Sequence, residues 1–107
     1  MLNYLMLVIY NSLIIVMKKL NGTKFQIRVW EEIKKIPKGQ TKTYKDIALT
    51  LKKPKSSRAV ANACGKNPLL IEIPCHRVIR SDGKLGGYSG KGGINQKRKL
   101  LKEEGAL

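Results

Sequence analysis

The 107-residue sequence is poor in acidic residues, in cysteine and in histidine. Its two cysteines, Cys64 and Cys75, are too few for the disulfide framework of a small secreted protein. Reduced thiols in the cytoplasm are therefore expected, and a single disulfide between the two is the alternative. The lone His76 and two separated cysteines form no cluster with metal-ligand spacing, so we expect neither a metal nor another cofactor.

Acidic side chains are far outnumbered by basic ones. The 7 Asp and Glu residues stand against 22 Lys and Arg, which gives a formal net charge of +15 at pH 7. The stretch from Lys34 to Arg58 contains only one acid, Asp46. A surface of this kind attracts a polyanion through phosphate contacts and counterion release. Nucleic acid is thus one predicted partner, and a merely solvated, lysine-rich surface is the alternative.

Charge is absent from the first 17 residues, most of which are apolar. The segment is shorter than the roughly 18 apolar residues of a membrane span, and it lacks the charged start and cleavage site of a signal peptide. We therefore predict no membrane partner. Two apolar runs, 4–10 and 13–17, flank Asn11-Ser12 and predict two short strands joined by a turn. Residues 1–22 are expected to be an apolar appendage, and residues 23–107 the functional domain.

Capping residues and a proline delimit two helices at the start of that domain. The pattern Thr23-x-x-Gln26 is a capping box, and apolar residues at helical spacing follow it. They predict a helix over 24–35 that ends before Pro37. A second helix is predicted over 44–51, where Thr43 can serve as its N-cap.

A third helix is predicted to begin at Ser56 or Ser57 and to end near Gly65. Together with the second helix and the basic turn between them, it makes a helix-turn-helix candidate, although ordinary helical hairpins look the same. The apolar run 69–73 predicts a short strand, and a last helix is predicted over 95–104. The expected fold is mainly α: a winged-helix-like helix-turn-helix domain with a short β segment and a glycine-rich wing or loop after Gly83.

Cys75 is the candidate for chemistry. It follows Pro74 and precedes His76, with Arg77 and Arg80 close behind. Neighbouring cations lower the pKa of a thiol, and the thiolate is the nucleophile. An isolated cysteine is more often a small buried hydrophobe, which is the interpretation favoured for Cys64. On these grounds alone, a nucleophile and a core cysteine remain equally good interpretations of Cys75.

A set of ordered motifs resembles the active-site signature of the O6-alkylguanine-DNA alkyltransferases. The central motifs are Ile73-Pro74-Cys75-His76-Arg77-Val78-Ile79, Ser81-Asp82-Gly83 and Gly86-Gly87-Tyr88-Ser89-Gly90. Upstream, the similarity includes Val29-Trp30, Thr43-Tyr44, Arg58-Ala59-Val60 and Asn67-Pro68, and downstream Lys97, Leu100-Leu101 and Glu104-Gly105. It covers about residues 23–105.

This resemblance implies a repair reaction that moves an alkyl group from guanine O6 irreversibly onto Cys75, with thymine O4 as a second candidate donor. His76 would withdraw the thiol proton through a water, and Glu104 would orient the imidazole. Asn67 would brace the active-site turn, and Tyr44 would protonate or polarise the departing guanine. Each protein molecule would act once.

The implied partner is double-stranded DNA that contains alkylated guanine. Arg58 would fill the stack after the base has been flipped out. Backbone groups of Cys75, Val78 and Ser89 would read the guanine edge, and Tyr88 would line the pocket. The remaining expected DNA contacts come from the helix-turn-helix, at Lys55, Ser57 and Ala59.

The sequence departs from the family pattern at two places. Only about 22 residues precede the matched region, where family members commonly have a larger N-terminal domain, so the appendage is interpreted as its remnant. A monomer is expected, with self-association through the apolar segment as the alternative. The loop Gly90–Asn95 is about two residues longer than usual.

Two other functions stay open: a lesion sensor like the alkyltransferase-like proteins, which characteristically lack the acceptor cysteine, and a plain winged-helix DNA-binding protein.

Overall fold

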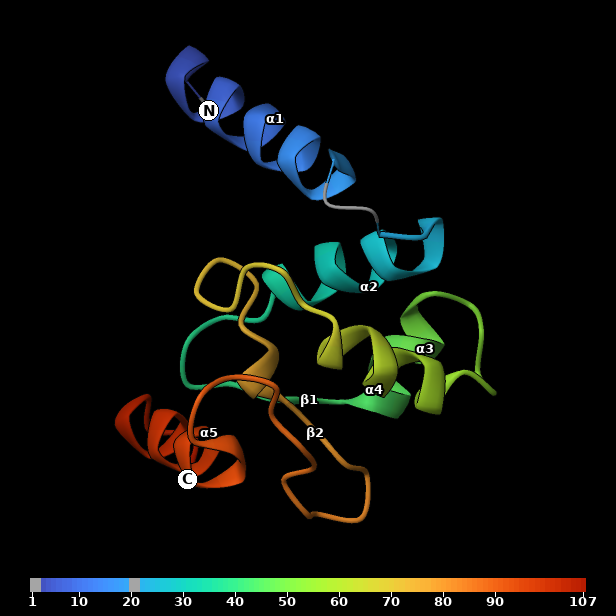
Figure 1. Cartoon of the computed structure of the whole chain (residues 1–107), viewed down its shortest axis with the longest axis vertical. Coiled ribbons are helices and arrows are strands. Elements are labelled where there is room, and N and C mark those ends of the chain that lie inside the picture. Colours follow the sequence, from blue (N-terminus) through green and yellow to red (C-terminus); the bar gives the residue numbers. More distant parts are fainter. Residues whose placement is uncertain (1–2, 20–21) are drawn as a thin grey trace.

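Helices dominate the computed structural model, which describes residues 3–19 and 22–107. Within these residues the elements follow in the order α1 (Tyr4–Lys19), α2 (Lys24–Lys34), β1 (Lys42–Thr43), α3 (Tyr44–Thr50), α4 (Ser57–Gly65), the 3₁₀ helix η1 (Cys75–Arg77), β2 (Val78–Ile79) and α5 (Gly93–Glu103). Figure 1 shows α2 lying across α3 and α4, with α5 on the other side of the strands. The mainly α fold that the sequence predicts is confirmed.

Local capping explains where α2 and α3 begin. The Thr23 hydroxyl accepts a hydrogen bond from the Gln26 amide at 3.0 Å, and the Gln26 side chain accepts one from the Thr23 amide at 2.9 Å. Thr43 and Asp46 make the same reciprocal pair at the start of α3, with both distances 2.9 Å. These pairs satisfy amide groups that the first turn leaves free. Both helices therefore match their predicted ranges to within one residue at each end.

The core lies where α2, α3 and α4 meet. Trp30 of α2 is 2% exposed, and its indole nitrogen donates to the Ala63 carbonyl of α4 at 2.9 Å. Around it pack the buried apolar side chains of Val29, Ile33, Ile47, Val60 and Ile73. A buried indole N–H needs such an acceptor, so this bond joins α2 to α4 in one defined position.

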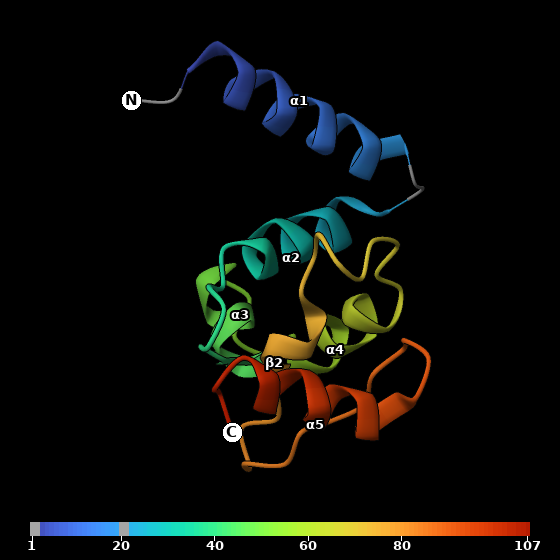
Figure 2. The same cartoon turned by 90° about the vertical axis from the view of Figure 1, so that its left-hand side faces the viewer.

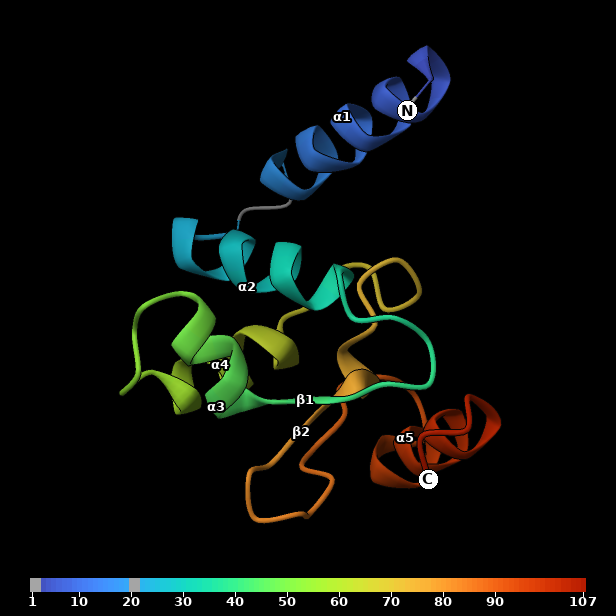
Figure 3. The same ribbon diagram turned by 180° about the vertical axis from the view of Figure 1, so that it is seen from behind.

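A two-stranded parallel sheet brings distant segments together. Lys42 of β1 lies opposite Val78 of β2, and Thr43 lies opposite Ile79. Because the pair is parallel, the start of α3 lies beside the residue that follows β2, and η1 lies at the opposite end of the two strands. Figure 3 shows from behind how β1 leads into α3. Tyr44 of α3 and Cys75 of η1 nevertheless line one cavity.

The strand predicted over residues 69–73 is wrong, because this segment forms turns. The Ile73 amide donates to the Leu69 carbonyl at 2.8 Å, and the Leu69 amide donates to the Asn67 side chain at 2.9 Å. Ile71 is 90% exposed. The run is apolar, but these local hydrogen bonds replace a strand ladder.

The two strands predicted in the first 17 residues are also wrong, because one helix, α1, spans Tyr4–Lys19. Asn3 caps it, accepting the Met6 amide at 2.8 Å. Asn11-Ser12 does not interrupt this helix, and a mostly apolar run of this length without Gly or Pro favours a helix over two strands. The described side chains, residues 3–11, are exposed, and α1 projects away from α3, α4 and α5 (Figures 1 and 2). Among the described residues, no helix is long and apolar enough to cross a membrane.

The glycine-rich segment forms the loop between β2 and α5. It begins with a turn in which the Arg80 amide donates to the Lys84 carbonyl at 3.0 Å. Gly92, with a φ of 93°, is the N-cap of α5, so the helix starts two residues before the predicted Asn95. Gly105, with a φ of 79°, follows its end as predicted.

Candidate active site

One cavity of about 720 Å³ gathers side chains from α3, α4, η1 and the glycine-rich loop. Six of the predicted site residues line it: Tyr44, Ser57, Arg58, Cys75, Tyr88 and Ser89. Arg58 is exposed at the second position of α4, whereas Cys75 is only 5% exposed. The cavity therefore runs from the helix-turn-helix surface down to the thiol.

Cys75 lies in a turn that Asn67 holds together. The Asn67 amide nitrogen is 2.7 Å from the Ile73 carbonyl oxygen and 2.8 Å from the Cys75 sulfur. The pKa of Cys75 is lowered from its ordinary value by hydrogen bonding from the Cys64 thiol, by the Asn67 amide and by the charge of Lys97, all against the opposing effect of burial. The site therefore favours the thiolate, the nucleophilic form of cysteine.

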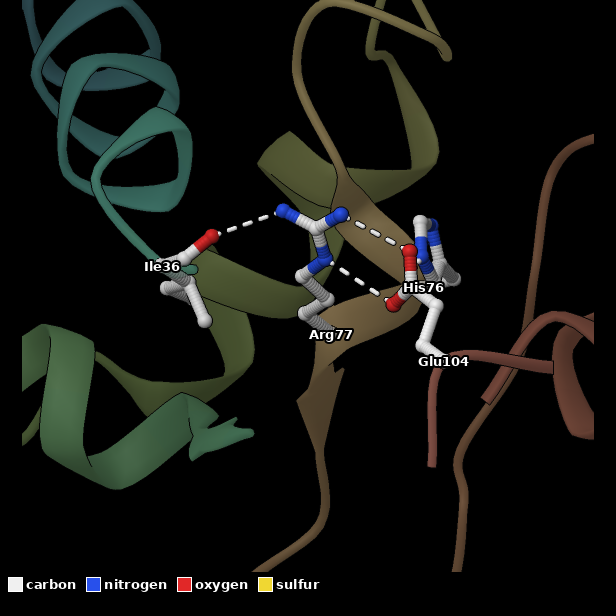
Figure 4. A network of polar contacts seen from close by, with 4 residues as sticks. All are labelled: Ile36, His76, Arg77 and Glu104. Atoms are coloured by element: carbon white, nitrogen blue, oxygen red, sulfur yellow. Dashed lines mark hydrogen bonds and ion pairs between the residues drawn. The ribbon is translucent and has the colours of Figure 1, made fainter. Parts of the chain in front are cut away.

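Glu104, at the end of α5, joins the two residues that follow Cys75. Its carboxylate is 2.9 Å from His76 Nε2, and Arg77 donates to both of its oxygens, at 3.0 and 2.7 Å. Arg77 also donates to the Ile36 carbonyl at 2.7 Å, as Figure 4 shows. Mainly because of the Arg77 hydrogen bonds, the pKa of Glu104 is lowered to about 2. The carboxylate is therefore charged at neutral pH and fixes the orientation of the imidazole.

The other imidazole nitrogen, His76 Nδ1, is buried and has no hydrogen-bond partner within the described residues. A buried polar atom of this kind is usually satisfied, by protein or by water. His76 itself is 7% exposed. Nδ1 is therefore the nitrogen of His76 that is left without a partner in the described part of the chain, although His76 does not line the cavity that contains Cys75.

Tyr44 and Lys97 form a second polar group beside the cavity. Burial raises the pKa of Tyr44 to about 12, so its hydroxyl remains a proton donor. Lys97 is fully buried, and its ammonium donates to the Val78 carbonyl at 2.7 Å and to the Gly87 carbonyl at 3.1 Å. It also lies 3.5 Å from the Tyr44 hydroxyl. Burial lowers the pKa of Lys97 to about 8.

Sequence reasoning did not assign the roles of Lys97 and Arg77. Lys97 is four residues before Leu101, so helical spacing alone puts it on the buried side of α5. In the sequence Arg77 is only a cation close to Cys75, and its bidentate pairing with Glu104 depends on tertiary contacts. The burial of Lys97 could be predicted from its helical spacing to Leu101. The ion pair between Arg77 and Glu104 could not be predicted from any pattern except that Arg77 follows His76.

Some predicted residues lie outside the cavity. Val78 is buried, its amide donates to the Cys75 carbonyl, and its own carbonyl is the one bound by Lys97. Lys55 and Ala59 are exposed on the helix-turn-helix. Neither of them lines the cavity.

Residues 24–106 match the family described as 6-O-methylguanine DNA methyltransferase, DNA binding domain. The chain belongs to this family. It is 53% identical over 83 residues to a methylated-DNA–protein-cysteine methyltransferase of Methanosarcina barkeri, an alignment that covers 78% of this chain and 51% of the relative. The chain spans about half the length, or less, of the curated relatives it matches.

Solved structures of the family share this fold. Mycobacterium tuberculosis OGT in complex with DNA matches with a TM-score of 0.75 and 50% identity, over 80% of this chain and 52% of that one. The S. pombe ATL in complex with DNA matches with a TM-score of 0.64 and 31% identity, over 78% of each chain. The family match includes every residue that lines the cavity and excludes α1.

Proposed function

We propose that this protein repairs DNA by moving a methyl or larger alkyl group from guanine O6 to the sulfur of Cys75. The observation that carries the proposal is the stabilised thiolate at Cys75, at the base of a cavity that opens toward the helix-turn-helix. Relatives of about 50% identity are named methylated-DNA–protein-cysteine methyltransferases.

The thiol proton is proposed to leave toward His76. A water between Cys75 and His76 Nδ1 would satisfy the buried nitrogen and carry the proton. Glu104 holds Nε2 at 2.9 Å and stabilises the positive charge that develops on the imidazole. The thiolate then attacks the alkyl carbon, and the bond between that carbon and O6 breaks as the carbon–sulfur bond forms.

The departing guanine needs a proton donor, which we assign to Tyr44. Its hydroxyl stays protonated because burial raises its pKa to about 12, and it lines the same cavity as Cys75. The product is a thioether at Cys75, which is stable to hydrolysis. Each protein molecule is therefore expected to react once.

The substrate is proposed to be double-stranded DNA, because the cavity adjoins a basic helix-turn-helix. Guanine O6 cannot be reached by a side chain inside a stacked duplex, so the base must be flipped into the cavity. Arg58 is exposed at the cavity mouth and is positioned to fill the gap in the stack. Lys55, Ser57 and Ala59 would contact the surrounding backbone, and the Ser89 backbone and Tyr88 the base. Thymine O4 is a further possible alkyl donor.

The proposed location is the cytoplasm. Both cysteines are free in the structure, and the reaction requires a reduced Cys75. A reducing compartment keeps such a thiol available.

Lesion sensing without transfer is the second candidate, because the match to S. pombe ATL covers equal shares of both chains. The two functions differ in one observable. A sensor holds the alkylated base and leaves it unchanged, whereas a transferase carries the alkyl group away on its own sulfur.

The test is to mix the protein with a duplex that contains O6-methylguanine and to record intact and peptide masses. We expect one methyl group per protein, located at Cys75, and none with Cys75→Ser or with an unmodified duplex. Lesion-selective binding without any mass gain would support the sensor instead. Salt-sensitive binding that does not distinguish the lesion would support a plain DNA-binding protein.

A further inference from the structure

Cys64 and Cys75 meet in the wall of the cavity. Cys64 is in the last turn of α4 and Cys75 begins η1, yet both line the same cavity. They are 7% and 5% exposed and belong to the same buried cluster. Each is also the neighbour with the largest effect on the pKa of the other. Both are free, and the chain has no other cysteine. The proposed alkyl acceptor therefore has a second thiol as its immediate neighbour.

We propose that Cys64 and Cys75 are the site of a reversible intramolecular disulfide, formed when a peroxide oxidises Cys75. The proposal deepens the proposed function, because it concerns the same sulfur. Its chemistry, however, needs no DNA and can be tested separately.

The reaction has two balanced steps. The Cys75 thiolate attacks one oxygen of the peroxide, the oxygen–oxygen bond breaks, and hydroxide or alkoxide leaves with a sulfenic acid on Cys75. The Cys64 sulfur then attacks the Cys75 sulfur, and the sulfur–oxygen bond breaks. The Cys64 proton goes to the departing hydroxide as water. The two thiols lose two electrons in total, and the peroxide gains them.

The contact between the thiols gives each cysteine a different role. The hydrogen bond from Cys64 lowers the pKa of Cys75, and the same bond, together with burial, raises the pKa of Cys64. Cys75 is thus the thiolate that a peroxide meets first, and Cys64 keeps its proton until the sulfenic acid forms. Because Cys64 lines the same cavity and is buried in the same cluster, it can react before a second oxidant molecule arrives.

The disulfide would have a protective effect. It removes the Cys75 thiolate, so oxidised protein cannot accept an alkyl group. It also stops oxidation at a stage that thiols reverse, whereas sulfinic and sulfonic acids are not restored by thiols. The acceptor is consumed by its own reaction, so a route that saves unreacted molecules preserves repair capacity.

The test treats the full chain with hydrogen peroxide in the absence of DNA. Free thiols are then blocked under denaturing, non-reducing conditions, and peptides are analysed by mass. We expect one linked peptide pair that contains Cys64 and Cys75, formed in the monomer, with the loss of two hydrogen atoms. After reduction with dithiothreitol, methyl acceptance from O6-methylguanine DNA should return to most of its untreated level.

Cys64→Ser and Cys64→Ala remove the second thiol in a polar and in an apolar way, so one of them serves if the other folds poorly. Each is compared with its own untreated capacity. In both, Cys75 should gain two or three oxygen atoms, and dithiothreitol should restore little acceptance. The proposal is overturned if the wild-type protein gives oxygenated Cys75, disulfide-linked dimers or unreacted thiols instead of the internal pair. Failure of methyl transfer in untreated protein would contradict the repair function and leave the disulfide result standing.

Discussion

At the scale of single residues, the neighbours of Cys75 stabilise a negative charge on a buried sulfur. Burial alone disfavours a thiolate, but the Cys64 thiol, the Asn67 amide and the Lys97 ammonium all favour it. Lys97 donates hydrogen bonds to two backbone carbonyls, which hold its positive charge in a fixed position from which it lowers the pKa of Cys75. The low pKa of Cys75 is thus a property of its neighbours and not of its position in a strand or helix.

Replacing Glu104 with Gln is expected to destabilise the protein at neutral pH by about 3 kcal/mol, because it leaves the largely buried Arg77 without its partner charge. The pKa of Glu104 is lowered from 4.5 to about 2 on folding, so its stabilising contribution is complete above pH 4.5 and is lost as the pH falls toward 2. Urea denaturation of both proteins between pH 3 and pH 7 measures this. The difference between wild type and Glu104→Gln should shrink on acidification.

Glu103→Gln is the matched control, since Glu103 is an exposed neighbour with no ion pair among the described residues. It should change stability by less than about 0.5 kcal/mol. Equal losses of stability in the two variants would mean that Glu104 stabilises the protein only through its negative charge, and not through its pairing with His76 and Arg77.

At the scale of elements, the sequence predicts those helix ends that local hydrogen bonds determine. The starts of α2 and α3 follow from reciprocal caps between residues three apart, which can be seen in the sequence. The apolar runs 4–10, 13–17 and 69–73 have no reciprocal cap of this kind, and the strands that the sequence predicts there are wrong. The motif around Cys75 predicts a candidate site, but the contacts of Arg77 and Lys97 come from elements far apart in the chain.

The glycine-rich loop depends on one glycine more than on the others. Gly86 has a φ of 76°, and a Cβ there would lie 2.8 Å from the Tyr44 hydroxyl. Gly86→Ala is therefore expected to cost about 1–2 kcal/mol through backbone strain, and to push the loop away from Tyr44. Thermal unfolding measures the first effect, and the rate of methyl transfer should fall with the second.

Gly87→Ala provides the comparison for stability. A Cβ at Gly87 meets nothing within 4 Å, and its φ lies outside the left-handed region. Gly87→Ala should leave the melting temperature nearly unchanged. If Gly86→Ala were equally harmless, close packing of the loop on Tyr44 would not be required.

At the scale of the whole molecule, the fold places some of the excess positive charge at the cavity and some away from it. The described core lies within residues 29–101, and the cavity opens beside α3 and α4. Lys45 of α3 lines this cavity, whereas Lys102 is on α5, which lies on the far side of the strands from α3 (Figures 1 and 3). Both are exposed lysines. A comparison of variants at Lys45 and Lys102 therefore separates attraction of DNA by net charge from binding of DNA at a defined face.

Binding to duplex DNA is expected to weaken steeply with salt, because each phosphate contact releases counterions. Removing one such contact lowers the slope of log K against log salt concentration by about 0.9. Lys45→Ala should show this reduction, and Lys102→Ala should not, although both variants lose the same charge. Fluorescence anisotropy of a labelled duplex over a salt series measures both slopes. Equal reductions in the two variants would mean that DNA is attracted by net charge alone, without a preferred face at α3 and α4.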